Sequence, residues 1–154
     1  MFSEEEQKEI VKKTNLLEKV KNGDLMLQEL SKLHTKKRVS WFMDNKDSVL
    51  QKYIGLPDEE KAYKIIYFDY MKINPGHCNV IKLSEGKIKI ESRNFCPYLE
   101  ACKKLCLDTE FICKESEPSI QQICKLINPN LKFRRNYQNI RPHADFCEEY
   151  FEII

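Results

Sequence analysis

The sequence predicts an α+β fold, in which N-terminal helices are followed by a small antiparallel sheet with helices inserted between a hairpin and two C-terminal strands. Apolar residues recur at helical spacing over residues 3–70, whereas apolar and polar residues alternate over residues 79–91. A chain of 154 residues is long enough to bury one hydrophobic core. We therefore expect a single domain over residues 1–154, with a helical N-terminal part (1–56) and a cysteine-bearing α+β core (57–154).

The N-terminal helices are indicated by their capping residues. Ser3 and Glu6 have the spacing of a capping box, and Asn22-Gly23 ends the helix that they begin. Asp24 is the expected cap of the next helix, whose apolar positions run through residues 26–34. A separate helical piece is expected to follow.

That piece covers residues 41–53 and closes at Gly55. Proline in the first turn and three acidic residues then mark a new helix start at residues 56–60. The stretch 64–70 is rich in Tyr, Ile and Phe, which favour strands, but the strong start signal predicts helix. Asn-Pro-Gly at residues 74–76 ends it.

The second half alternates between strands and short helices. Residues 80–83 and 88–91 form the two strands of a hairpin around the turn 84–87. Three short helices are expected next, over residues 97–107, from Asp108 or Thr109, and from Glu117-Pro118 to the stop at 128–130. Residues 131–137 and 145–153 are the two closing strands.

Charge and hydropathy exclude two classes of partner. The 26 basic and 24 acidic residues are nearly balanced, which does not favour nucleic-acid binding through phosphate neutralisation. No apolar run approaches the ~20 residues of a membrane span. The acidic start lacks a signal-peptide core, so we expect a cytoplasmic protein with a small-molecule ligand and leave its oligomeric state open.

All seven cysteines follow residue 77. In a reducing cytosol they are expected to be thiols or ligands and not a disulfide framework. Cys102, Cys106 and Cys124 lie on apolar helix faces and are expected to pack in the core. His77-Cys78 is either a loop ligand pair or an idle loop segment.

Cys96 is the strongest candidate for chemistry. Because it precedes Pro97 and an apolar helical run, its thiol is expected at a helix N-terminus, where the dipole lowers the pKa. If residues 143–147 are extended, His143, Asp145 and Cys147 share one face of the last strand. Cys96 would then be a nucleophile, His143 its base and Asp145 the orienter, although His143 also suits a surface turn.

A metal centre is the alternative for the same region. Cys96, Cys113, Cys147 and His143 are a sensible ligand set for zinc or an iron–sulfur cluster, with the cofactor identity left open. No Cys-x-x-Cys spacing is present, so the fold would have to assemble the site; Cys113 also suits simple burial.

Arginines near the last strand suggest an acidic ligand. Arg134, Arg135 and Arg141 lie close to it in the sequence, and Arg134 and Arg141 are the candidate substrate-binding residues because guanidinium groups hold carboxylates in a fork. Exposure to solvent is the alternative for at least two of the three arginines.

Two segments, 94–102 and 128–149, resemble blocks in the L-2-amino-thiazoline-4-carboxylic acid hydrolase-like family. The matching features are Cys96-Pro97, Cys113 and Cys147, and the resemblance covers roughly residues 57–154. The chain also resembles, more distantly, the 4-vinyl reductase-type ligand-binding domains.

The resemblance implies a hydrolase-like protein that acts on a C–N bond of a small, sulfur-containing acid, with a cyclic amidine-like substrate. The residues themselves favour a non-enzymatic sensor module that binds metal or a small ligand through Cys96, Cys113 and Cys147. Both functions remain open at this point, including whether the protein is an enzyme.

Overall fold

The computed structural model describes residues 1–154 and has the predicted α+β architecture. The α-helices are α1 (Glu4–Lys21), α2 (Leu27–Lys52), α3 (Asp58–Lys64), α4 (Pro97–Leu105), α5 (Thr109–Cys113) and α6 (Glu117–Ile127). The strands are β1 (Cys78–Ser84), β2 (Lys87–Ser92), β3 (Leu131–Asn136) and β4 (Cys147–Ile153). A π-helix, η1 (Ile65–Tyr70), continues α3, and three short 3₁₀ turns are η2 (Pro75–His77), η3 (Lys114–Ser116) and η4 (Tyr137–Asn139).

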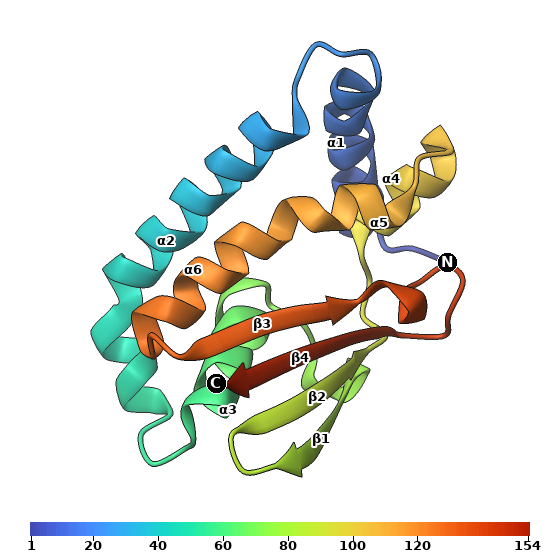
Figure 1. Ribbon diagram of the computed structural model, residues 1–154. Coiled ribbons are helices and arrows are strands. Elements are labelled where there is room, and N and C mark those ends of the chain that lie inside the picture. The colour runs from blue at the N-terminus through green and yellow to red at the C-terminus, as the bar shows by residue number, and fades with distance from the viewer.

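The four strands form one antiparallel sheet in the order β1-β2-β4-β3. The last strand of the chain is therefore central, between the hairpin and β3. Gly86, with φ of +79°, allows the tight turn between β1 and β2. The helices α3 and α6 pack against the sheet, α2 runs beside α6, and α1 and α4 pair at one end of the molecule (Figure 1).

Apolar side chains separate into two buried clusters. The larger joins α2, α3, η1, α6 and the inner face of the sheet, with Phe42, Tyr67 and Phe151 fully buried. The smaller holds α1 against α4 and α5 through Leu17, Ala101, Cys102 and Ile112. Burial of apolar area drives both contacts.

Several expected boundaries are wrong. Asp24 does not cap a helix, because α2 begins with Met26 as its N-cap and has no side-chain cap. The two expected pieces, 26–34 and 41–53, are one helix. Its central polar run contains no glycine or proline, and a helix with one solvent-facing side tolerates such a run.

The last strand begins later than expected. Residues 143–146 form a turn and a bend, so β4 starts at Cys147 and not at residue 145. The extended geometry expected for His143 and Asp145 is therefore wrong.

Candidate functional site

A cavity of about 140 Å³ lies between the inner face of the sheet and the segment from α4 to η3. It lies where the two apolar clusters meet, since its wall includes Tyr67 and Ile120 from one and Ile112 from the other. The polar side chains on its wall are Arg38, Ser92, Asn94, Cys96, Tyr98, Cys113, Glu115, Ser116, Arg135, Arg141, Cys147 and Glu149. A wider groove of about 690 Å³ between α2 and α6 contains none of the thiols. The smaller cavity is therefore the candidate site.

Three of the seven cysteines face this cavity, and they come from three different elements. Cys96 is the N-cap of α4 as expected, Cys113 ends α5, and Cys147 begins β4. The three candidates chosen from the sequence are thus brought together, although the first and the last lie 51 positions apart in the chain.

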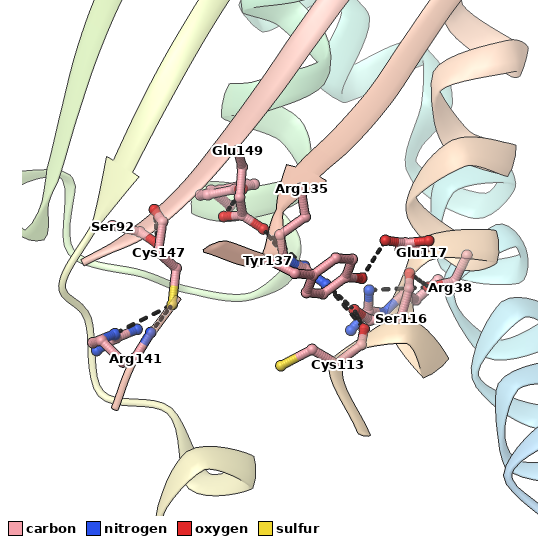
Figure 2. A network of polar contacts seen from close by, with 12 residues as sticks. Arg38, Ser92, Cys113, Ser116, Glu117, Arg135, Tyr137, Arg141, Cys147 and Glu149 are labelled. Atoms are coloured by element: carbon pink, nitrogen blue, oxygen red, sulfur yellow. Dashed lines mark hydrogen bonds and ion pairs between the residues drawn. The ribbon is translucent and has the colours of Figure 1, made fainter. Parts of the chain in front are cut away.

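Sheet register brings a charged pair to the cavity wall. Arg135 and Glu149 are direct partners across β3 and β4, and the Arg135 Nη2 lies 2.7 Å from Glu149 Oε2. Their side chains are only 9% and 7% exposed. Arg135 also donates to the Cys113 carbonyl at 2.9 Å and to the Ser116 hydroxyl at 3.3 Å. Figure 2 shows Arg135 between Glu149 on one side and Cys113 and Ser116 on the other.

Tyr67 completes this network from η1. Its hydroxyl donates to the second oxygen of Glu149. Burial and Glu149 raise the pKa of Tyr67 well above its usual range, so its phenol stays protonated. Burial lowers the pKa of Arg135, but the charges around it, Glu149 first, outweigh this effect and raise it. The network is therefore a neutralised, hydrogen-bonded part of the wall.

Arg141 has a different environment. Its backbone N–H and its Nε donate to Cys147 Sγ at 3.5 and 3.4 Å, and its Nη1 donates to the Asn94 carbonyl at 2.6 Å. No carboxylate pairs with it. Figure 2 shows the Cys147 sulfur directed at this guanidinium group.

The thiols of Cys96 and Cys113 are held in the neutral form. Burial raises the pKa of Cys96, although the N–H groups of Leu99 and Tyr98 and the charge of Arg141 partly offset the rise. The lowering expected from its helix N-terminal position is therefore wrong, because desolvation of the thiolate outweighs the helix terminus. Burial likewise raises the pKa of Cys113 to about 12.

Tyr98 contributes a buried polar atom with no partner. Tyr98 lines the cavity, and its buried hydroxyl has no hydrogen bond. Leaving such a group unpaired costs roughly 1–3 kcal/mol, which a ligand in the cavity could recover.

Three predicted site residues do not line the cavity. His143 and Asp145 are exposed, and His143 Nε2 hydrogen-bonds to the Tyr137 carbonyl at 3.2 Å. Arg134 lies on the outer face of the sheet, where its guanidinium carbon is 4.1 Å from the centre of the Tyr150 ring. Of the two arginines predicted to bind a substrate, Arg141 lines the cavity and Arg134 does not.

No group of three or more His, Cys, Asp or Glu side chains is placed to hold a metal ion. The metal site on Cys96, Cys113, Cys147 and His143 stays a prediction that the geometry does not favour.

The cysteines expected to pack in the core differ in their burial. Cys102 and Cys124 are buried as expected, but Cys106 is exposed, because α4 ends there with a left-handed φ of 55° and its side chain leaves the apolar face.

Sequence reasoning missed the Arg135–Glu149 pair and Tyr98. A signal for the pair was present: Leu131, Phe133 and Arg135 share one strand face, as do Cys147, Glu149 and Phe151. Charges on otherwise apolar faces indicate a buried pair. Nothing local marks the Tyr98 hydroxyl as unpaired.

Comparisons with known proteins establish only the fold. No protein-family model matches the chain. No curated protein matches it significantly. A crystal structure of a trafficking protein particle complex subunit 3 from Naegleria fowleri, covalently bound to palmitic acid, superposes with a TM-score of 0.54 at 12% identity. The match covers 96% of this chain and 95% of that one. No helix here has the length and apolarity needed to cross a membrane.

Proposed function

We propose that this protein is a non-enzymatic binding module for a small carboxylic acid, which is held in the cavity lined by Cys96, Cys113 and Cys147. The observation that carries the proposal is Arg141, a guanidinium group on the cavity wall with no carboxylate partner. Its Nε and Nη1 donate to Cys147 and Asn94, which leaves the Nη2 group as the charged N–H donor for a carboxylate.

The charges on the wall support an anionic ligand. Both wall carboxylates are engaged, Glu149 with Arg135 and Glu115 with His34. Arg38 donates to the Ser119 hydroxyl and stacks on Tyr70, without an ion pair. The wall therefore has three arginines against two carboxylates, and a bound carboxylate would balance the remaining positive charge.

The size of the cavity supports a small ligand. At ~30 Å³ of liquid volume per water, 140 Å³ corresponds to about four or five water molecules. Pockets for drug-sized ligands begin near ~300 Å³. The palmitic acid of the structural neighbour is far larger than this cavity. We therefore propose an acid of about two to four carbons, since its roughly four to six non-hydrogen atoms are close to the number of waters that the cavity could hold.

An NMR titration with acetate tests the proposal, with acetamide as its neutral match. Acetate is expected to shift the signals of the Arg141 Nε–H and of the Cys147 amide, whereas acetamide shifts them less. Arg141→Gln should remove the acetate response, and Arg134→Gln, on the outer sheet face, should keep it. Equal responses to acetate and acetamide in the unmodified protein would contradict the proposal.

The hydrolase is the second candidate, and one observation favours it: Cys96 is the N-cap of α4 and shares the cavity with Arg141. In this reading Cys96 attacks a C–N bond of a cyclic amidine-like acid, with His143 and Asp145 brought closer by a movement of their turn. Incubation with 2-amino-thiazoline-4-carboxylate tests it. Ring opening that Cys96→Ser abolishes would support the hydrolase, and an intact ring after prolonged incubation with the unmodified protein would reject it.

The proposal also assumes a cytoplasmic location. All seven cysteines are free thiols, and a reducing compartment keeps them available for a ligand.

A further inference from the structure

We infer that Cys147, and not Cys96, is the residue to which the acid attaches covalently, and that the acid has an electrophilic carbon next to its carboxylate, as in a 2-oxo acid. This inference rests on the proposed function. It follows from the position of one guanidinium group relative to one sulfur.

The sulfur of Cys147 accepts two hydrogen bonds, both from Arg141. Neither Cys96 nor Cys113 accepts a hydrogen bond from a charged side chain, and burial raises the pKa of both thiols. Reactive cysteines lie in electropositive, partly exposed surroundings. All three cavity cysteines are half-buried, and Cys147 is the one whose sulfur accepts a hydrogen bond from a guanidinium group.

The guanidinium group that contacts the sulfur also offers the anchor for the ligand. Nη1 of Arg141 is bonded to Asn94, whereas Nη2 donates to no protein atom and lies in the same rigid plane as Nε. A carboxylate held by Nη2 lies beside the sulfur. The atom nearest the sulfur is then the carbon bonded directly to the carboxylate, and this requirement selects 2-oxo acids over acids with more distant electrophiles.

The attachment is a simple addition. The sulfur forms a bond to the 2-carbon, the π-electron pair of the ketone moves to its oxygen, and the thiol proton ends on that oxygen. Nothing leaves, and no oxidant or further reactant is needed. Tyr98 lines the same cavity and has a buried hydroxyl without a hydrogen bond, and we assign the new hydroxyl as its partner.

The test compares iodoacetate with iodoacetamide, two alkylating agents that differ in the carboxylate next to the reactive carbon. In each, the sulfur–carbon bond forms as iodide leaves with the bonding pair and the thiol proton passes to water. Mass spectrometry follows Cys147 and the exposed Cys106 in the same sample, so that Cys106 is an internal reference. The rate ratio of iodoacetate to iodoacetamide is expected to be about tenfold or more higher at Cys147 than at Cys106, the size of one charge-assisted hydrogen bond.

Two further experiments test whether the electrophilic carbon and Arg141 cause the preference of Cys147 for iodoacetate. Pyruvate should slow the labelling of Cys147 but not that of Cys106, and propionate, which lacks the electrophilic carbon, should protect much less. Arg141→Gln should remove the preference for iodoacetate, Arg141→Lys should restore part of it, and Arg134→Gln should leave it intact.

The outcomes separate this inference from the function on which it rests. If propionate protects as well as pyruvate, the acid binds without attachment, and the inference fails while the binding module stands. If Cys96 is labelled first, the inference is likewise overturned. If the two labelling agents show equal ratios at both cysteines and neither acid protects, the inference and the binding of a small acid fail together.

Discussion

The Arg135–Glu149 pair is the residue-scale feature on which the cavity wall depends. Both side chains are nearly inaccessible, yet Glu149 also accepts a bond from Tyr67 and Arg135 donates to Cys113 and Ser116. A buried ion pair contributes little net stability by itself, but the removal of one partner leaves the other charge buried and uncompensated.

We therefore expect Glu149→Gln to lower the free energy of unfolding by about 3–5 kcal/mol. Urea denaturation measures this change. The double variant Arg135→Gln/Glu149→Gln should lose less than the sum of the single losses, because neither charge is then left alone. Arg134→Gln, next along β3 but exposed, should cost less than about 1 kcal/mol. Equal losses for Glu149→Gln and Arg134→Gln would contradict this explanation.

Helix starts are the features that matter at the scale of the element. Asp108 caps α5 by accepting from the Glu110 N–H at 3.1 Å, and α5 places Cys113 at the cavity. Asp24 has the same residue type at an expected helix start but makes no such bond, because α2 begins after Met26. The two aspartates are therefore a matched pair, one with a capping bond and one without.

Asp108→Ala is expected to destabilise the protein by about 1 kcal/mol, the usual cost of losing an N-cap. Asp24→Ala should change the unfolding free energy by less than about 0.5 kcal/mol, as is typical of exposed positions. Thermal or urea unfolding compares the two. A larger loss for Asp24→Ala than for Asp108→Ala would show that the cap of α5 is not the stronger interaction.

At the scale of the whole molecule, the neutral thiols make the free energy of unfolding depend on pH. Burial raises the pKa of Cys102 to about 11 and those of Cys113 and Cys124 to about 12, and it also raises that of Cys96. Below the ordinary thiol pKa of about 9 the folded and unfolded states hold the same protons. Above it the unfolded chain loses protons that the folded protein keeps.

The free energy of unfolding should therefore fall as the pH rises from about 9 to about 12, the interval between the ordinary thiol pKa and that of Cys113. The slope is about 1.4 kcal/mol per pH unit for each such thiol. Urea denaturation at about pH 8.5, 10 and 11 measures this slope, because the first value lies below the ordinary thiol pKa of about 9 and the other two lie above it. Cys113→Ala should flatten the decline, whereas Cys106→Ala, at an exposed position, should follow the unmodified protein. An identical slope in all three proteins would contradict the raised pKa of Cys113 as a cause of the decline.

Much of the fold followed from local patterns. The capping box at Ser3, the alternation in the hairpin and the helix start at Cys96-Pro97 all appear as predicted, since each depends on neighbours within a few residues. The central polar run of α2 and the turn before Cys147 were misjudged. The run in α2 lacks a helix-breaking residue, and the residues before Cys147 have no pattern that separates a turn from a strand.

The candidate site was predicted in part. Cys96, Cys113, Cys147 and Arg141 meet in one cavity, whereas His143, Asp145 and Arg134 lie outside it. Strand alternation places Arg134 and Arg135 on opposite faces, and Leu131 and Phe133 mark the face of Arg135 as the apolar one.

The sequence by itself determined the α+β class, the helix starts at Ser3, Cys96 and Asp108, and the three cysteines worth following, because capping and periodicity are local properties of the chain. The tertiary structure alone decided that β4 lies between β2 and β3, which brings Cys147 and Glu149 to the cavity. It also decided that desolvation raises the pKa of Cys96 and that Arg141 contacts the Cys147 sulfur. Desolvation and pairing depend on segments far apart in the chain, and no local pattern records which of these segments will meet.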